Sequence, residues 1–217
     1  MERKLINWTG LTGIVSLISY TAAVVIAPLA FPGYNRMAQA VSDLSAETAP
    51  SRLLWNQLSA AYNVCCPACM MCVSIFVSDK KISTKMFRLG IYLFAIMNWI
   101  SAIGYRMFPL SDSGKEIGTF QEKMHIAVTI VVVLLSIASL TVLIIAGLKK
   151  NGMKGIGIWA SIALAMMFVG AIGKSAVSPA YFGVVERFSV FAAVGFNAVL
   201  GAYLLNGFRD RYWQKQR

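Results

Sequence analysis

The chain has 217 residues, of which 58% are hydrophobic and 13% are charged, and its formal net charge is +11. Soluble domains average about 25% charged residues, so the composition excludes an ordinary soluble domain and is typical of a membrane protein. No basic groove or nucleic-acid-binding motif accompanies the positive charge, and we therefore expect no nucleic-acid partner.

Six long apolar segments follow one another along the chain, each near or above the about 20 residues that a helix needs to cross the hydrocarbon core. They cover residues 8–31, 54–77, 86–110, 124–148, 155–179 and 184–208. The sequence therefore predicts an all-α fold, in which residues 1–217 form a single integral membrane domain built as a bundle of six transmembrane helices.

The basic residues are distributed unequally between the two sides of such a bundle. If all six helices cross, one side carries 13 of the 20 Lys and Arg residues, including those at both ends of the chain. The positive-inside rule makes this side cytoplasmic. We expect a multi-pass protein of the plasma (cytoplasmic) membrane, with the N- and C-termini inside and the long 32–53 connection outside. Membrane lipids are its expected partners, and the sequence leaves the oligomeric state open.

Polar residues share faces of the predicted helices. Asn56 and Asn63 lie on one face of the second helix, and Asn98 and Tyr105 lie on one face of the third. Lipid tails cannot satisfy such groups, so we expect these faces to point into the bundle.

Ionisable residues collect at the ends of the helices that face away from the cytoplasmic side. Asp43 lies in the 32–53 connection, within a stretch of turn-forming serines that predicts a short helix over the helix ends. The third helix ends at Arg106, a Phe-Pro break and Asp112, and His125, the only histidine, opens the fourth. The remaining candidates, at the ends of the fifth and sixth helices, are Lys174, Glu186 and Arg187.

Three interpretations of this outer group remain open. Its members could be ion pairs that lock helix ends together, with Glu186 as the nearest candidate partner of Lys174. They could form a ligand site, in which the cations hold a phosphate or carboxylate and the polar faces with Asn56 and Asn98 contribute further contacts. They could also catalyse a reaction, with His125 paired with Asp112 or Asp43 for acid–base chemistry.

Metal and cofactor chemistry has little support in the sequence. One histidine cannot build a three-histidine zinc site, and no nucleotide, haem or nucleophile-elbow motif is present. Four cysteines at positions 65, 66, 69 and 72 lie in the middle of the second helix, where we expect them to pack as small apolar residues. We therefore expect neither a metal nor a cofactor.

Several short motifs together resemble a known family. They are S-D-L-S at 42–45, A-P at 49–50, W-N at 55–56, F-P-x-x-D at 108–112, the helix-opening His125 and G-V-V-E-R-F at 183–188. Their order resembles that in a family of bacterial and archaeal six-helix membrane proteins catalogued as domain of unknown function 998. In a bacterium the resemblance implies the inner membrane. A looser similarity to the Frag1/DRAM/Sfk1 membrane proteins, some of them linked to lipid remodelling or distribution, implies a lipid-related role.

The sequence thus favours an integral membrane protein with an outward-facing polar site that binds a lipid headgroup or a small amphiphile. One alternative is a membrane-embedded lipid-modifying enzyme that uses His125 with Asp112 or Asp43. Another is a small proton-coupled transporter.

Overall fold

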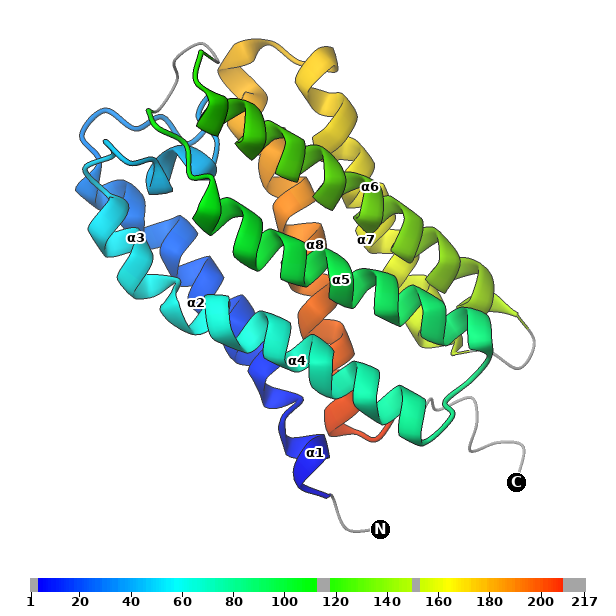
Figure 1. Cartoon of the computed structure of the whole chain (residues 1–217). Helices are drawn as coiled ribbons and strands as arrows, with labels where there is room; N and C mark the ends of the chain where they lie inside the picture. Colours follow the sequence, from blue (N-terminus) through cyan, green and yellow to red (C-terminus); the bar gives the residue numbers. More distant parts are fainter. Residues whose placement is uncertain (1–3, 113–117, 150–152, 209–217) are drawn as a thin grey trace.

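The computed structural model describes residues 4–112, 118–149 and 153–208, apart from the side chain of Lys174. Within these ranges all regular secondary structure is helical (Figure 1). The α-helices are α1 (Leu5–Trp8), α2 (Leu11–Ile26), α3 (Arg52–Leu58), α4 (Ala60–Asp79), α5 (Lys85–Met107), α6 (Phe120–Leu148), α7 (Lys154–Ala176) and α8 (Phe182–Leu205). Three short 3-10 helices are η1 (Ala27–Ala30), η2 (Ser42–Ser45) and η3 (Pro179–Tyr181).

Six helical segments of the described chain are long and apolar enough to cross a membrane. They are Leu5–Ala30, Ala60–Asp79, Lys85–Met107, Phe120–Leu148, Lys154–Gly173 and Pro179–Leu205. This confirms the predicted all-α fold of a multi-pass membrane protein. The second segment is shorter than the sequence predicts, because the chain breaks at Ser59 and the residues before it form the separate helix α3.

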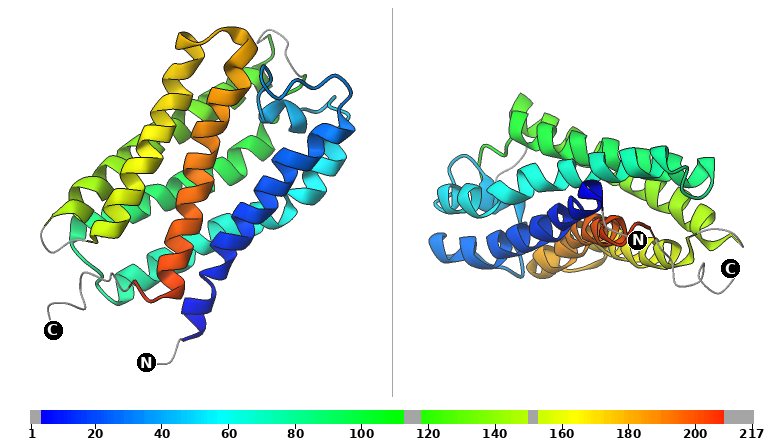
Figure 2. Two further views of the ribbon diagram at one scale, coloured as in Figure 1. Left: turned by 180° about the vertical axis from the view of Figure 1, so that it is seen from behind. Right: turned by 90° about the horizontal axis from the view of Figure 1, so that it is seen from below.

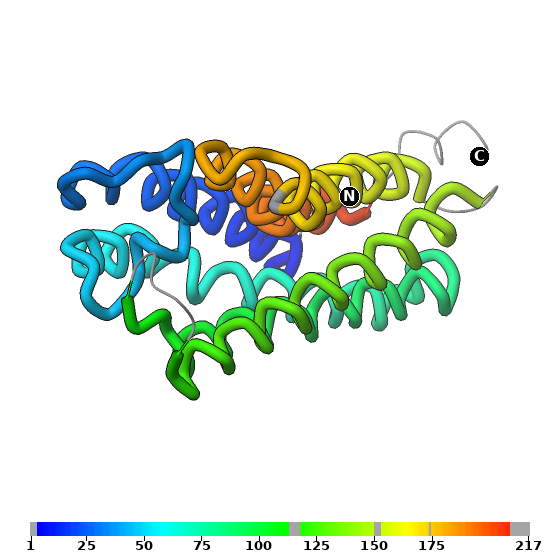
Figure 3. Tube along the Cα trace, turned by 90° about the horizontal axis from the view of Figure 1, so that it is seen from above, coloured from blue at the N-terminus to red at the C-terminus, as the bar shows by residue number. Residues whose placement is uncertain are grey.

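The six long helices form two layers. One layer holds α2, α8 and α7, and the other holds α4, α5 and α6 (Figures 2 and 3). Neighbouring helices contact one another around the bundle, and α8 also contacts α4 across its centre. The start of α1 and the end of α8 lie at one end of the bundle, while residues 31–51, here called the cap, cover the other end (Figure 1). We call the two ends the terminal end and the cap end.

Close contact between α2 and α8 depends on residues without side chains. A Cβ atom added to Gly201 would lie 2.5 Å from the carbonyl oxygen of Gly10 and 3.1 Å from the Cα of Gly13. Small residues allow such backbone approach between membrane helices. Nearby, the fully buried Asn197 donates to the Ser16 hydroxyl at 3.1 Å, which adds a polar contact along the same seam.

Local sequence signals explain where the two longest helices of one layer begin. The Thr84 hydroxyl accepts a hydrogen bond from the N–H of Phe87 and caps the start of α5. At the start of α6, Thr119 and Glu122 form a reciprocal capping box. Such caps satisfy backbone N–H groups that have no partner within the helix. The end of α5 lies beside the start of α6 at the cap end (Figure 1).

Two buried clusters fill the bundle. The larger contains Phe76, Phe87, Phe94 and Phe196, together with aliphatic residues from α4 to α8. The smaller lies below the cap around Tyr20, whose ring is 4.7 Å from that of Tyr62, 5.7 Å from Trp55 and 5.9 Å from Phe191. The cap therefore rests on aromatic side chains from four helices, α2, α3, α4 and α8.

Candidate functional site

Arg187 joins the first turns of α8 to the cap. Its guanidinium donates to the carbonyl oxygens of Arg36 at 2.8 Å and Gln39 at 3.2 Å, and also to that of Gly183. Its second terminal nitrogen donates to the Tyr34 hydroxyl at 2.8 Å. A planar guanidinium presents several donors in a fixed fork. One side chain therefore holds the cap at Tyr34, Arg36 and Gln39. Both terminal nitrogens of Arg187 thus donate hydrogen bonds to oxygen atoms of the protein itself.

Gly183 completes this contact because the cap lies directly on it. A Cβ atom at this position would lie 2.3 Å from the Gln39 carbonyl oxygen and 2.7 Å from that of Arg36. These are the same carbonyls that Arg187 binds one turn further along α8. The G-V-V-E-R-F motif therefore supplies both the space and the donors that dock the cap.

Two carboxylates lie in the same region. Glu186 accepts a hydrogen bond from the N–H of Val41 at 3.2 Å, and the buried Asp43 accepts one from the N–H of Ala40 at 3.1 Å. Burial raises the pKa of Asp43 above its ordinary value, outweighing the opposing effects of the Ala40 N–H and the Arg187 charge. Burial likewise raises the pKa of Tyr34. The structure thus brings Asp43, Glu186 and Arg187 together where the cap meets α8, and Glu186 and Arg187 form a clamp that holds the cap.

The raised pKa of Asp43 predicts a specific effect of Asp43→Asn. A folded-state pKa above the unfolded value gives stability that is present below the unfolded pKa, about 3.9, and is lost as the pH rises through the folded pKa. The amide oxygen of Asn can still accept from the Ala40 N–H. We expect the variant to unfold at the same temperature as wild type near pH 4 and at a higher temperature near pH 7, measured by thermal unfolding in detergent. A variant less stable than wild type at pH 7 would contradict this prediction and show that the cap needs the charge.

His125 lies one turn into α6 and binds the end of α5. Its Nδ1 is 2.8 Å from the Phe108 carbonyl oxygen, which can only accept, so Nδ1 carries a proton. The Tyr105 ring packs against the imidazole at 5.0 Å between ring centroids. Thr129 connects the two, since its hydroxyl donates to the His125 carbonyl and accepts from the Tyr105 hydroxyl. This contact places His125 in the junction between α5 and α6.

The turn after Phe108 also contacts the cap. Asp112 accepts a hydrogen bond from the Thr48 hydroxyl at 2.8 Å, and the Leu110 carbonyl oxygen accepts one from the N–H of Glu47 at 2.8 Å. Asp112 thus forms a hydrogen bond with Thr48, and Asp43 forms one with Ala40. His125 forms its hydrogen bond with Phe108. The structure places the three predicted catalytic residues at the same end of the bundle, with these separate partners.

The remaining predicted site residues lie apart from the clamp. Asn56 is exposed on α3, so the expectation that it points into the bundle is wrong, because α3 is a separate short helix with no buried residue. Asn98 is buried in α5, where it donates to the Phe94 carbonyl and accepts from the Cys66 thiol at 2.9 Å. The expected partnership of Lys174 with Glu186 falls on a side chain outside the described part of the chain.

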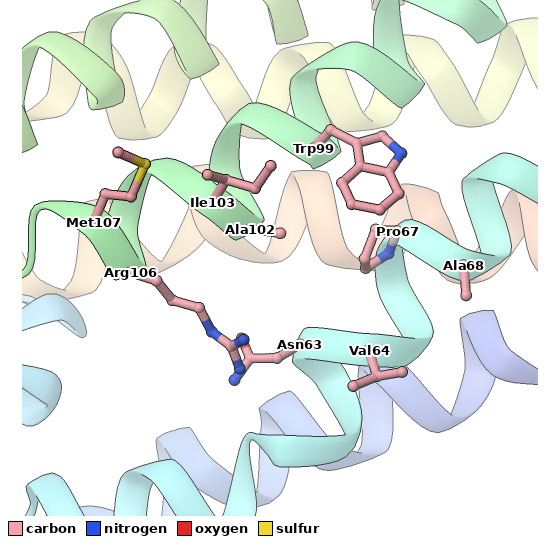
Figure 4. A pocket seen from close by; sticks show the side chains of 9 residues that line it. All are labelled: Asn63, Val64, Pro67, Ala68, Trp99, Ala102, Ile103, Arg106 and Met107. Atoms are coloured by element: carbon pink, nitrogen blue, oxygen red, sulfur yellow. The ribbon is translucent and has the colours of Figure 1, made fainter.

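Arg106 has a different environment from Arg187. It lies in the last turn of α5 and is exposed, at one end of a cleft of about 530 Å³ between α4 and α5 (Figure 4). In the figure its guanidinium points to the side chain of Asn63. Neither side chain has a hydrogen-bond or ion-pair partner among the residues the structure describes. The other lining residues are Val64, Pro67, Ala68, Trp99, Ala102, Ile103 and Met107.

A second cleft of about 470 Å³ lies near α2, α7 and α8, and it is also mainly apolar. Its arginines are Arg36 and Arg187. Arg36 donates to the Val25 carbonyl oxygen at 3.0 Å, and Arg187 binds the cap carbonyls. Both cations of this cleft therefore bind the protein's own backbone, unlike Arg106. Within the described residues, no group of three or more His, Cys, Asp or Glu side chains could hold a metal ion.

Two contributors to these sites were not predicted as site residues from the sequence. Tyr34 is not among the candidates, because nothing in the sequence of a polar connection indicates which of its residues will contact α8. The sequence marks Asn63 indirectly, through its polar face and through Pro67 four residues later. An interior proline removes the N–H that would bind the carbonyl of Asn63.

Comparison with known proteins gives one match. The profile of the family described as "Protein of unknown function (DUF998)" matches residues 14–203. No curated protein and no solved structure matches the chain. The matched region extends from α2 into α8 and so includes the cap, the Arg187 clamp and the α4–α5 cleft. Its six long apolar helices make the chain a multi-pass membrane protein. The chain belongs to the DUF998 family.

Proposed function

We propose that the protein binds an anionic lipid headgroup or a small anionic amphiphile at its cap end. The observation that carries the proposal is the guanidinium of Arg106, which has no partner in the described chain and lies at the end of an apolar cleft. A phosphate or carboxylate can accept two parallel hydrogen bonds from a guanidinium. The apolar lining matches the chain of the same ligand.

The location of the cleft supports a ligand that comes from the bilayer. It lies between two membrane-spanning helices, and the large side chains of Trp99 and Ile103 along it are exposed. Ligand sites are typically apolar with a few polar groups that fix orientation. Here Arg106 and the Asn63 amide are those polar groups, and a lipid can enter sideways between α4 and α5.

The charge distribution supports an outward orientation of the cap end in the plasma membrane. The terminal end carries the excess of Lys and Arg, including Lys80, Lys81 and Lys85 between α4 and α5. The positive-inside rule places such connections in the cytoplasm. On this basis the Arg106 cleft opens toward the outer leaflet.

Arg106→Gln tests the proposed function. The probe is phosphatidate, added to the purified protein in neutral detergent, and bound lipid is counted by native mass spectrometry. Hydrogen bonds to a charged group contribute about 1.5–3 kcal/mol, so we expect the apparent affinity to fall about tenfold or more.

Arg52→Gln is the matched control, because Arg52 is an exposed arginine at the same end that donates to the Glu47 carbonyl outside the cleft. It should bind phosphatidate like wild type. Equal binding by wild type and Arg106→Gln would remove the cleft from the proposed function.

A further inference from the structure

Pro67 removes the usual helical donor of one backbone carbonyl in the cleft wall. Pro67 lies inside α4 and lines the cleft together with Asn63. In a regular α-helix the N–H at position 67 would donate to the carbonyl of Asn63, but proline has no N–H. No side chain in the described ranges donates to this carbonyl either. Hydrocarbon cannot supply the missing hydrogen bond.

The Asn63 carbonyl lies at a defined position along the cleft, between Arg106 near the cap end and the apolar residues further from it. Helix carbonyls point toward the C-terminus, so that of Asn63 faces Pro67, one turn further from the cap end. Arg106 lies nearer the cap end, and its guanidinium reaches the level of the Asn63 side chain (Figure 4). Beyond the carbonyl the lining is apolar, with Ala68 and Trp99 at the far end. Cation, acceptor and apolar surface therefore follow in this order.

A ligand that matches this order has an anionic group, then a hydrogen-bond donor, then a hydrocarbon chain. A lysophospholipid has these parts in sequence: the phosphate, the free hydroxyl on the middle carbon of glycerol, and one acyl chain. In a diacyl phospholipid the oxygen on that carbon is part of an ester, so it cannot donate. A fatty acid has no donor between its carboxylate and its chain.

We propose that the preferred occupant of the α4–α5 cleft is an anionic lysophospholipid, whose phosphate binds Arg106 and whose glycerol hydroxyl donates to the Asn63 carbonyl. This inference rests on the proposed function, and it names the ligand class of the same site. The lining of the cleft along α5, from Trp99 to Met107, is about 12 Å long at 1.5 Å per residue. That length lies within one leaflet of a hydrocarbon core of about 30 Å, which suits a single chain entering from one side.

The first test compares two ligands on the wild-type protein. They are palmitoyl lysophosphatidate and its analogue with hydrogen in place of the glycerol hydroxyl, measured by native mass spectrometry in neutral detergent. The two share charge and chain length, so their affinity ratio reports the hydroxyl alone. One hydrogen bond to an otherwise unsatisfied acceptor should favour the hydroxylated ligand about fivefold to tenfold. Equal affinities would overturn the inference.

The second test is Pro67→Ala, which restores the missing N–H while keeping an apolar side chain. Because Ala forms helix far better than Pro, we expect the variant to fold. The restored N–H occupies the Asn63 carbonyl, so the affinity ratio should fall to about one through weaker binding of the hydroxylated ligand. An unchanged ratio in this variant would overturn the assignment to the Asn63 carbonyl.

Two further variants separate this inference from the proposed function. Pro28→Ala changes a buried proline in η1, outside the cleft, and should keep the wild-type ratio. Arg106→Gln should weaken both ligands equally, since both carry the phosphate. If Arg106→Gln has no effect, the proposed function fails; if it weakens both ligands while the wild-type ratio is one, only the lysophospholipid inference fails.

Discussion

Replacing Arg187 with Ala is expected to detach the cap from α8. The side chain donates to three backbone carbonyls, those of Arg36, Gln39 and Gly183, and to the Tyr34 hydroxyl. Each hydrogen bond from a charged donor contributes about 1.5–3 kcal/mol. We expect the free energy of unfolding to fall by about 3 kcal/mol or more. Thermal unfolding in detergent measures this loss, and faster tryptic cleavage after Arg36 would report the release of the cap.

Two comparisons make the Arg187 prediction specific. Arg187→Lys keeps the charge but cannot span several carbonyls with one ammonium group, so it should restore only part of the stability. Arg52→Ala removes an exposed arginine with one described hydrogen bond, to Glu47, and should change stability by less than about 1 kcal/mol. If Arg187→Ala unfolded at the wild-type temperature with its cap still protected, the clamp would have no energetic role.

Gly201→Ala is expected to separate α2 from α8. The new methyl carbon would lie 2.5 Å from the carbonyl oxygen of Gly10 and 3.2 Å from the sulfur of Cys69. The nearest atom belongs to backbone, so relief requires movement of a whole helix rather than a rotamer change. Overpacking of this kind costs about 1–3 kcal/mol and occasionally more. We expect a loss near the upper end, measured by thermal unfolding in detergent.

Gly195→Ala is the matched control on the same helix. A Cβ at this position meets nothing within 4 Å, and Ala forms helix better than Gly by up to about 1 kcal/mol. The control should therefore be neutral or slightly stabilising. Equal effects of the two substitutions would show that helix propensity decides the outcome and that the α2–α8 contact tolerates a methyl group.

The two arginines at the cap end show why residue type alone does not identify a binding site. In the sequence Arg106 and Arg187 are equivalent candidates for holding an anion, because both lie at helix ends near a membrane surface. In the structure Arg187 meets carbonyl oxygens that the cap brings from about 150 residues away in sequence. Arg106 meets an apolar cleft and an amide instead. Their partners come from other parts of the chain, and only folding sets those distances.

The sequence by itself determined the fold class, the membrane character and the family. These properties depend on the length and apolarity of consecutive segments and on the order of local motifs, which survive without any knowledge of contacts. The tertiary structure alone decided that Arg187 binds the cap, that His125 joins α6 to the end of α5, and that Asn63 lies opposite Arg106 across the α4–α5 cleft. Helical periodicity places a residue on a face of its own helix. The rotation and crossing of each helix against its neighbours determine what that face meets, and they result from packing of the whole bundle.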